Sequence, residues 1–111
     1  MAAKFEVQKN KKGEFFFNLI APNGRTILSS EQYSTKSAAL NGIESVKKNC
    51  QSDSAFERLE NKNHEPYFVL KAKNGEIIGK SEAYSSKASM ENGISSVKEN
   101  APSAEIKDLT V

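Results

Sequence analysis

Histidine and cysteine, the residue types best suited to act as a base or a nucleophile near neutral pH, occur once each in this 111-residue chain. His64 ends the polar stretch NKNH, where we expect a solvent-exposed turn. Cys50 continues the apolar spacing of a predicted helix, so we expect a small buried residue and not a reactive thiol. Nucleophilic catalysis needs a base positioned beside the nucleophile. An exposed His64 and a buried Cys50 would not form such a pair. We therefore expect no catalytic residue and a function that is not enzymatic.

Tyrosine and lysine recur at one spacing, in YSTK at residues 33–36 and in YSSK at residues 84–87. Short-chain dehydrogenases use such a pair in catalysis, but the spacing here is one residue too short and no glycine-rich dinucleotide loop accompanies it. The segment KKGEFFF has a faint likeness to an aromatic RNA-recognition motif, although a glutamate interrupts the pattern and the surrounding order of elements differs. We assign neither activity.

The same two segments lie where helices are expected to begin, which suggests anion binding. Free backbone N–H groups and partial positive charge at a helix N-terminus can hold a phosphate, sulfate or carboxylate. The candidate anion site consists of the hydroxyl and lysine residues of both segments: Ser34, Thr35, Lys36, Ser85, Ser86 and Lys87. In the alternative, Ser34 and Ser85 only cap the helices and the lysines are solvated. The neighbouring Glu31 and Glu82 weaken the anion interpretation unless they pair with those lysines.

The segments recur because the chain is internally duplicated. SEQYSTKSAALNGIESVKKN at residues 30–49 corresponds to SEAYSSKASMENGISSVKEN at residues 81–100, and a shift of 51 residues aligns Phe5 through Cys50 without a gap. Two copies are too few for a solenoid. We expect two like halves that share one core about a pseudo-twofold axis, in a single domain over residues 1–111. The repeats are predicted at about residues 4–53 and 54–109.

Each copy begins with segments that alternate with the period of two typical of β-strands. AKFEVQ at residues 3–8 alternates in this way, and EFFFNLIA at residues 14–21 and PYFVLKA at residues 66–72 are apolar at every second position. Asn-Gly pairs at 23–24 and 74–75 predict hairpin turns, since both residue types tolerate positive φ. The chain then returns as RTILSS and as EIIGKS, which predict a third strand in each copy.

The apolar period then changes to the 3.6 residues of a helix. One face is apolar or small in both copies: Ala39, Gly42, Ile43, Val46 and Cys50, then Met90, Gly93, Ile94, Val97 and Ala101. Because a glycine inside a helix costs about 0.5–1 kcal/mol relative to alanine, we predict that Gly42 and Gly93 let each helix approach the sheet closely. The helices should end at Asn49 and Asn100, and Pro102 prevents continuation of the second.

A last strand is expected near residues 104–109, which correspond to SAFERL at residues 54–59. The full order is βββα–βββα–β. We therefore predict an α+β fold in which two tandem β(3)-α-β repeats form one antiparallel sheet, with both helices on one face.

The opposite face of the sheet combines aromatic, aliphatic and basic residues. The candidate outer-face site comprises Phe16, Ile20, Tyr67, Val69, Lys71 and Lys73. Single-stranded nucleic acid binds such surfaces by stacking its bases on rings and its phosphates on lysines, and a protein partner would use the same apolar patch. In the alternative, these residues cover one another or are buried by exchanged strands.

The composition narrows the choice of partners. Sixteen basic residues against 14 acidic ones give a net charge of +2, too small to indicate nucleic acid or anionic membrane by itself. A lone cysteine excludes an internal disulfide and any multi-cysteine zinc site, and we expect no cofactor. No leader or long apolar run is visible, so we expect a cytoplasmic protein that does not contact the membrane. The duplication within one chain favours a monomer, because the two halves can satisfy each other.

The strand pairs FFFNLIAPNGRTIL and YFVLKAKNGEIIG, with SExYSxK…NGIxSVKxN in both copies, resemble the YegP-like family of small bacterial proteins of unknown function. The resemblance covers essentially the whole chain. It implies two β(3)-α-β units in a single sheet, with terminal strands exchanged between the halves, and no established activity. Pro66 departs from the pattern, and its missing N–H predicts an edge position or the start of a strand. The sequence favours a binding module with an unknown partner, and single-stranded nucleic acid or a small anion stays open as the alternative.

Overall fold

The computed structural model describes residues 3–110, and its elements follow the predicted order. The first copy forms β1 (Lys4–Lys9), β2 (Phe15–Ile20), β3 (Thr26–Ser30) and α1 (Lys36–Asn49). The second copy forms β4 (Phe56–Glu60), β5 (Pro66–Lys71), β6 (Ile77–Lys80) and α2 (Lys87–Asn100). Two short 3-10 helices and a last strand complete the chain: η1 (Asp53–Ala55), η2 (Ala101–Ser103) and β7 (Glu105–Asp108). Pro66 is the first residue of β5, as its missing N–H predicted.

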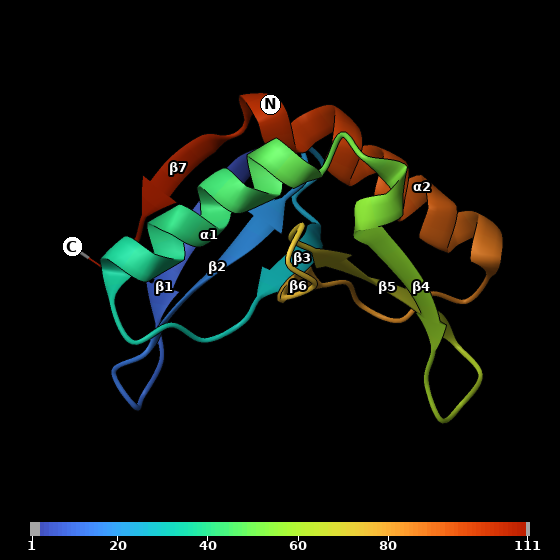
Figure 1. The fold of residues 1–111 in the computed structure, drawn as a ribbon, viewed down its shortest axis with the longest axis horizontal. Helices are drawn as coiled ribbons and strands as arrows, with labels where there is room; N and C mark the ends of the chain where they lie inside the picture. The colour runs from blue at the N-terminus through green and yellow to red at the C-terminus, as the bar shows by residue number, and fades with distance from the viewer. Residues whose placement is uncertain (1–2, 111) are drawn as a thin grey trace.

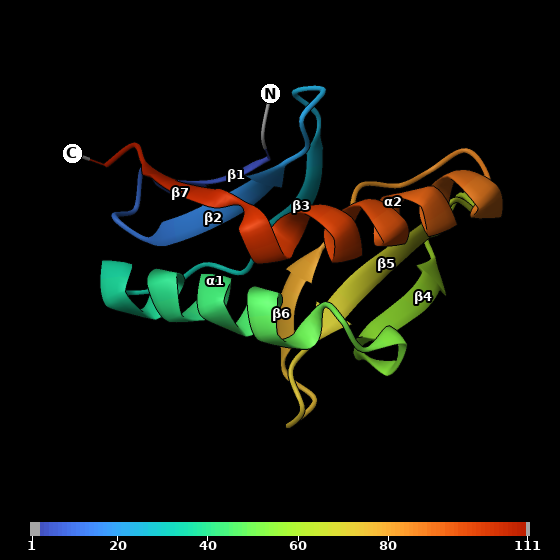
Figure 2. The same cartoon turned by 90° about the horizontal axis from the view of Figure 1, so that it is seen from above.

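All seven strands form one sheet in the order β4-β5-β6-β3-β2-β1-β7. Both helices cover the same face of this sheet and run in opposite directions (Figures 1 and 2). The prediction of an entirely antiparallel sheet was wrong, because β7 pairs with β1 in parallel. The chain enters β7 after η2, at the end of the sheet where β1 begins, so the two strands run the same way.

The predicted exchange of terminal strands is confirmed. Counted with the helix that precedes it, each of these strands pairs with the other half: β4, which follows α1, pairs with β5, and β7, which follows α2, pairs with β1. Six strands are related by the pseudo-twofold axis, which passes between β3 and β6. The seventh, β7, is an addition at one edge only, so the two edges of the sheet differ.

The axis itself requires a departure from symmetry. Leu28 on β3 corresponds to Gly79 on β6 at the repeat spacing of 51 residues. A Cβ atom at Gly79 would lie 2.9 Å from Cγ of the fully buried Leu28. Two leucines therefore do not fit at the axis, and one large residue packs against one glycine.

An aromatic cluster repeats in each half between the sheet and its helix. Phe5 and Phe17 meet edge to face at 5.7 Å, and Tyr33 stacks on Phe17 at 6.4 Å. In the second half Phe68 takes the same place, with Phe56 at 5.6 Å and Tyr84 at 6.3 Å, so that both repeats bury the same motif.

The helix glycines provide the space for these tyrosines. A Cβ at Gly42 would lie 2.5 Å from Oη of Tyr33, and one at Gly93 would overlap Oη of Tyr84. The prediction that both glycines allow close packing is therefore confirmed. The neighbour that requires the space is a tyrosine from the segment before the helix, stacked on the sheet.

The helix caps are shifted by one residue from the prediction. Thr35 and Ser86 are the N-caps, and not Ser34 and Ser85. Both N-caps have extended backbones, and their hydroxyls accept hydrogen bonds from the N–H groups of Ala38 and Ser89, at 3.0 and 3.1 Å. The helices end at Asn49 and Asn100 as predicted.

We predict that Gly42→Leu and Gly93→Leu each lower the melting temperature by several degrees. Overpacking costs about 1–3 kcal/mol, which exceeds the roughly 0.5–1 kcal/mol that replacing a helical glycine regains. Thermal unfolding followed by circular dichroism measures the change, and Ser37→Ala at an exposed helix position is the control. Unchanged melting in both leucine variants would mean that this helix face is not tightly packed.

Candidate functional site

Two matching clefts lie where the two repeats meet. The first has a volume of about 730 Å³ and surrounds Tyr84, and the second has a volume of about 710 Å³ and surrounds Tyr33. Each combines the helix and tyrosine of one repeat with the β-hairpin of the other, as residues 21–27 face Tyr84 and residues 72–78 face Tyr33. Both clefts therefore exist only in the duplicated, assembled chain.

Four polar residues are the same in the two clefts. The Tyr33 cleft contains Glu31, Tyr33, Asn41 and Ser45, and the Tyr84 cleft contains their counterparts Glu82, Tyr84, Asn92 and Ser96. Backbone hydrogen bonds hold each tyrosine against the start of a strand, from Tyr33 N to Phe15 O at 2.7 Å and from Tyr84 N to Pro66 O at 2.8 Å.

Both tyrosines carry neutral hydroxyls at physiological pH. Burial raises the pKa of Tyr33, and the carboxylates of Glu31 and Glu76 raise it further. Burial also raises the pKa of Tyr84, with Glu82 adding to the effect. A phenol with a raised pKa donates and accepts hydrogen bonds but is a poor base or nucleophile.

The clefts differ in charge at one position. Glu76 lines the Tyr33 cleft, and its counterpart at the repeat spacing, Arg25, lines the Tyr84 cleft. The Tyr33 cleft therefore has two carboxylates, from Glu31 and Glu76, whereas the Tyr84 cleft has one carboxylate and one guanidinium. A cation is favoured in the first cleft and not in the second.

Most of the repeated residues have a structural task. Ser30 Oγ accepts a hydrogen bond from Phe17 N at 2.8 Å, and Ser81 Oγ accepts one from Phe68 N at 3.0 Å. The side chains of the helix-ending asparagines donate back to the carbonyls of Ser45 and Ser96 at 2.8 and 2.9 Å. Together with the tyrosines and glycines, these contacts account for much of the identity between the copies.

Asn41 and Asn92 are different, because they are exposed and lack a structural task. The helix positions exposed in both copies are the pairs Ser37/Ala88, Asn41/Asn92, Glu44/Ser95 and Lys48/Glu99. Only the asparagine is the same in both, and in the described part of the chain neither asparagine side chain has a hydrogen-bond partner. Our reading of the sequence missed both residues, although an identical pair among divergent exposed positions was visible in it.

The residues of the predicted anion site are not equivalent in the two copies. Lys36 pairs with Asp108 of β7, with 2.7 Å between Nζ and Oδ2, so a carboxylate of the chain itself already lies there. The hydroxyls of Thr35 and Ser86 cap their helices, while Ser34 and Ser85 are exposed. Lys87 is exposed and has no ion-pair partner among residues 3–110.

The predicted outer-face residues vary widely in exposure. Ile20 and Val69 are buried, with 9% and 3% of their surface exposed, whereas Phe16 and Tyr67 are partly exposed. Three lysines surround this surface in different ways. Lys80 lies over the ring of Tyr67 at 5.1 Å, Lys71 pairs with Glu57, and Lys73 is exposed.

The two residues considered first for catalysis are far from a catalytic arrangement. Cys50 is fully buried in the core, whereas the side chain of His64 is 86% exposed and contacts Glu60 at 3.1 Å. His64 has a φ of 63°, and its counterpart Gly13 has a φ of 81°. The two residues therefore share the left-handed backbone conformation of the turn, which does not require an imidazole side chain. No cluster of three or more potential metal ligands occurs within residues 3–110.

None of the described helices has the length and apolar character needed to cross a membrane.

Comparison with known proteins identifies the family. The family model described as "Domain of unknown function (DUF1508)" matches residues 10–57 and 61–108, one match for each copy. The chain belongs to this family. Its units start one strand later than the repeats we predicted and end in β4 and β7, the two strands that are exchanged between the halves.

Relatives extend over the whole chain. UPF0339 protein YegP of Yersinia pestis is 52% identical over 96% of this chain and 96% of its own length. Solution NMR structures of a UPF0339 protein from Shewanella oneidensis and of the E. coli protein of unknown function yegP match with TM-scores of 0.92 and 0.93. Their sequences are 48% and 44% identical to this chain. Each match covers 98% of this chain, and the matches cover 92% and 94% of the two NMR structures. The DUF1508 fold is thus shown, and the relatives are uncharacterised.

We predict that the attachment of β7 weakens as the pH falls from about 4 to 2. The hydrogen bonds from Lys36 and from Thr110 hold the pKa of Asp108 at about 2, below its ordinary value of 3.8. A lowered folded-state pKa means that the stabilisation is complete above the unfolded-state pKa and is lost as the pH falls through the folded-state pKa.

The protection of the Leu109 amide from hydrogen exchange measures this attachment, because that amide donates to Val7 O at 2.9 Å. In Asp108→Asn, protection should be low throughout and should no longer follow this pH range. Constant protection of Leu109 in the unaltered protein between pH 4 and 2 would contradict the prediction.

Proposed function

We propose that this protein is a non-enzymatic binding module that holds polar ligands in the two clefts. The observation that carries the proposal is the pair Asn41 and Asn92, the only identical pair among the helix positions exposed in both copies. Both asparagines line the clefts. An exposed asparagine adds little to packing, and it supplies one hydrogen-bond acceptor and two donors to a bound molecule.

The remaining lining residues support the same chemistry. A neutral tyrosine hydroxyl and a serine hydroxyl stand in each cleft beside the asparagine, and both groups donate and accept hydrogen bonds. Volumes of about 730 and 710 Å³ lie within the range of roughly 300–1,000 Å³ that is typical of small-molecule sites. A ligand rich in N–H and O–H groups, such as a peptide end or an amino compound, matches this lining.

Binding is favoured over catalysis because the clefts contain no activated group. The raised pKa values keep Tyr33 and Tyr84 protonated, and the single cysteine and the single histidine lie outside both clefts. General acid–base catalysis needs a group whose pKa lies near the working pH. These features support a module that binds without turnover, and a cytoplasmic location stays a prediction.

The outer-face surface for single-stranded nucleic acid stays a weaker proposal. Two of its aliphatic residues, Ile20 and Val69, are buried, and Lys71 pairs with Glu57. Anion binding at both helix starts is likewise less favoured, because Asp108 already pairs with Lys36.

The difference in charge between the clefts allows a direct test. We predict that N-acetylarginine amide, a small cation with several hydrogen-bond donors, shifts ¹⁵N–¹H resonances around Tyr33 and leaves those around Tyr84 unchanged. Binding on the order of 1 mM is expected for so small a probe. Asn41→Ala and Glu76→Arg should abolish the shifts, because they remove a hydrogen-bonding amide and a carboxylate from the Tyr33 cleft.

Asn92→Ala is the matched control, since it makes the same change in the other cleft and should leave the shifts at Tyr33 unaltered. The variant Arg25→Glu should extend cation binding to the Tyr84 cleft. Equal shifts in both clefts of the unaltered protein, or shifts that persist in Asn41→Ala, would contradict the proposal.

A further inference from the structure

The strand β7 shows how this fold accepts an extended segment at a sheet edge. It runs parallel to β1, and the carbonyls of Ala3 and Val7 accept hydrogen bonds from the amides of Glu105 and Leu109, at 3.4 and 2.9 Å. The contact continues onto the helix, where Asp108 pairs with Lys36. Backbone pairing to the strand is thus combined with one ion pair to the helix above it.

The opposite edge of the sheet has the same construction without the added strand. In the described chain β4 pairs with β5 alone, and it forms the far edge in Figure 1. At the repeat spacing of 51 residues, Val7 corresponds to Arg58 on β4, and Lys36 corresponds to Lys87 on α2. At the open edge, the carbonyl of Arg58 therefore corresponds to the Val7 carbonyl that accepts a hydrogen bond from β7. Lys87 likewise corresponds to the lysine that pairs with Asp108.

A cleft lies beside this edge, between β4 and the start of α2. Its volume is about 630 Å³, and its lining includes Leu59, Pro66, Met90 and Lys87. In the first half the counterpart of Lys87 contacts Asp108 of β7, so this cleft corresponds to the place where β7 ends. Arg58, Glu60 and Glu91 also line the cleft, and Arg58 pairs with Glu91, whereas the exposed Lys87 has no ion-pair partner among residues 3–110.

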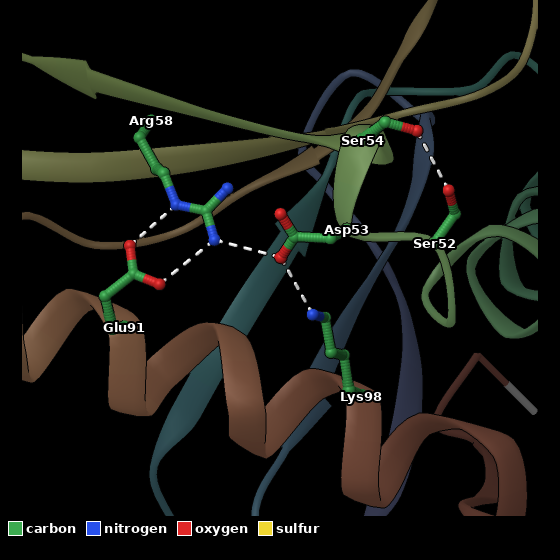
Figure 3. A network of polar contacts seen from close by, with 6 residues as sticks. All are labelled: Ser52, Asp53, Ser54, Arg58, Glu91 and Lys98. Carbon is green, nitrogen blue, oxygen red and sulfur yellow. Dashed lines mark hydrogen bonds and ion pairs between the residues drawn. The ribbon is translucent and has the colours of Figure 1, made fainter.

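Two positions near the open edge are charged where the corresponding positions of the first half are apolar. Val7 and Leu40 in the first half correspond to Arg58 and Glu91 in the second, and Val7 is fully buried. Figure 3 shows that Arg58 bridges Glu91 on α2, with 2.6 Å between Nε and Oε2, and Asp53 on η1, with 3.1 Å between Nη2 and Oδ1. Charged side chains on an edge strand are typical of an edge that is exposed to water.

We propose that β4 and the cleft beside α2 bind an extended segment of another protein, which runs parallel to β4 as β7 runs along β1. This inference is independent of the two tyrosine clefts. Addition of a strand to a sheet edge obtains affinity from the backbone and specificity from side-chain pockets. In the register of β7, the segment places an aliphatic residue beside Phe56, a basic residue beside Glu57 and an acidic residue beside Arg58 and Lys87.

The charges on the edge support that choice of residues. Glu6 on β1 lies opposite Lys107 of β7, and its counterpart Glu57 keeps the same charge. Lys87 lies where the acidic residue of the incoming segment would come, as Lys36 lies beside Asp108 in the first half, whereas the neighbouring Arg58 already pairs with Glu91 and Asp53. Opposite charges on neighbouring strands stabilise strand pairing.

A segment of a different protein is favoured over a second copy of this chain. A second copy can offer its β7 only by detaching that strand from β1 and by breaking the ion pair between Asp108 and Lys36. Such an exchange covers β4 of one copy but uncovers β1 of the other. A segment from another protein adds strand pairs to β4 and leaves the pairing of β7 with β1 intact.

The test uses the whole protein and a peptide that has the sequence of β7 and its neighbouring residues. The peptide AEIKDLT, acetylated and amidated, corresponds to residues 104–110. Titration of the ¹⁵N-labelled protein should shift the amides of residues 56–60 and of Lys87. A nitroxide at the C-terminus of the peptide should broaden resonances near Glu60 and not those near Asp53, because a parallel strand ends beside Glu60.

Matched variants separate strand addition from simple ion pairing. In the protein, Lys87→Glu should weaken peptide binding about tenfold, because it replaces an attraction by a repulsion. Lys73→Glu makes the same change of charge in the β5–β6 turn and should leave the affinity unaltered. In the peptide, proline in place of leucine removes the N–H that corresponds to the one Leu109 donates in β7, and binding should be lost.

Several results would overturn the proposal. Shifts confined to β1 would mean that the peptide replaces β7 at its own site, and broadening near Asp53 would mean that the strand is antiparallel. Undiminished binding of the proline peptide would mean that only the charges interact. A protein that dimerises through β4 in sedimentation experiments would show that a second copy occupies the edge.

Discussion

The structure depends on the meeting of two like halves at an axis where symmetry cannot be complete. Leu28 and Gly79 occupy equivalent positions on either side of this axis, and the glycine has no room for a side chain beside the leucine. The strand pair β3–β6 contains only the pairs Ser29–Lys80 and Ser30–Gly79, so backbone pairing contributes little to the junction. The contact between the halves therefore relies on the shared core, in which one large residue from the first repeat occupies the space at the centre.

Joining the halves also creates the two tyrosine clefts. Each cleft needs the helix of one repeat and the hairpin of the other, so a single repeat has no complete cleft. Tyr33 and Tyr84 contribute both to the packing within each repeat and to the clefts between the repeats. Their rings stack on phenylalanines of the sheet, and their hydroxyls lie against a helix glycine. The two repeats keep this packing and differ in charge at one hairpin position, which is Arg25 in the first copy and Glu76 in the second. The two clefts are therefore similar in volume and different in electrostatics.

The edges of the sheet lie furthest from the axis, and their stability depends on how the backbone groups of the edge strands are covered. An unpaired edge strand presents free N–H and C=O groups that attract other strands. At one edge β7 covers β1 and is held by the ion pair between Lys36 and Asp108. At the other edge the charges of Asp53, Arg58 and Glu91 lie beside β4, where hydrogen bonds from Lys98 and Arg58 lower the pKa of Asp53 and those from Arg58 lower the pKa of Glu91. One repeat motif thus gives two edges that differ in strand pairing and in charge.

Local signals in the sequence determined most of the elements. Alternation with a period of two located the strands, the 3.6-residue stripe located both helices, and the internal repeat indicated the pseudo-twofold arrangement, whereas the exchange of strands was implied by the family resemblance. These features depend on neighbouring residues or on the spacing between copies, and both can be read from one chain. The position of the helix glycines on the buried stripe likewise indicated close packing before the neighbouring side chain was known.

Only the tertiary structure decided the features that join distant residues. The direction of β7 depends on where α2 ends relative to β1, and the N-caps depend on the backbone angles of Thr35 and Ser86. The clefts join residues 21–27 to the second helix and residues 72–78 to the first, across gaps in sequence that no local period spans. The open edge at β4 is likewise a consequence of strand order, which leaves β4 paired with β5 alone in the described chain. Local propensity selects each element, whereas the shared core selects which elements meet.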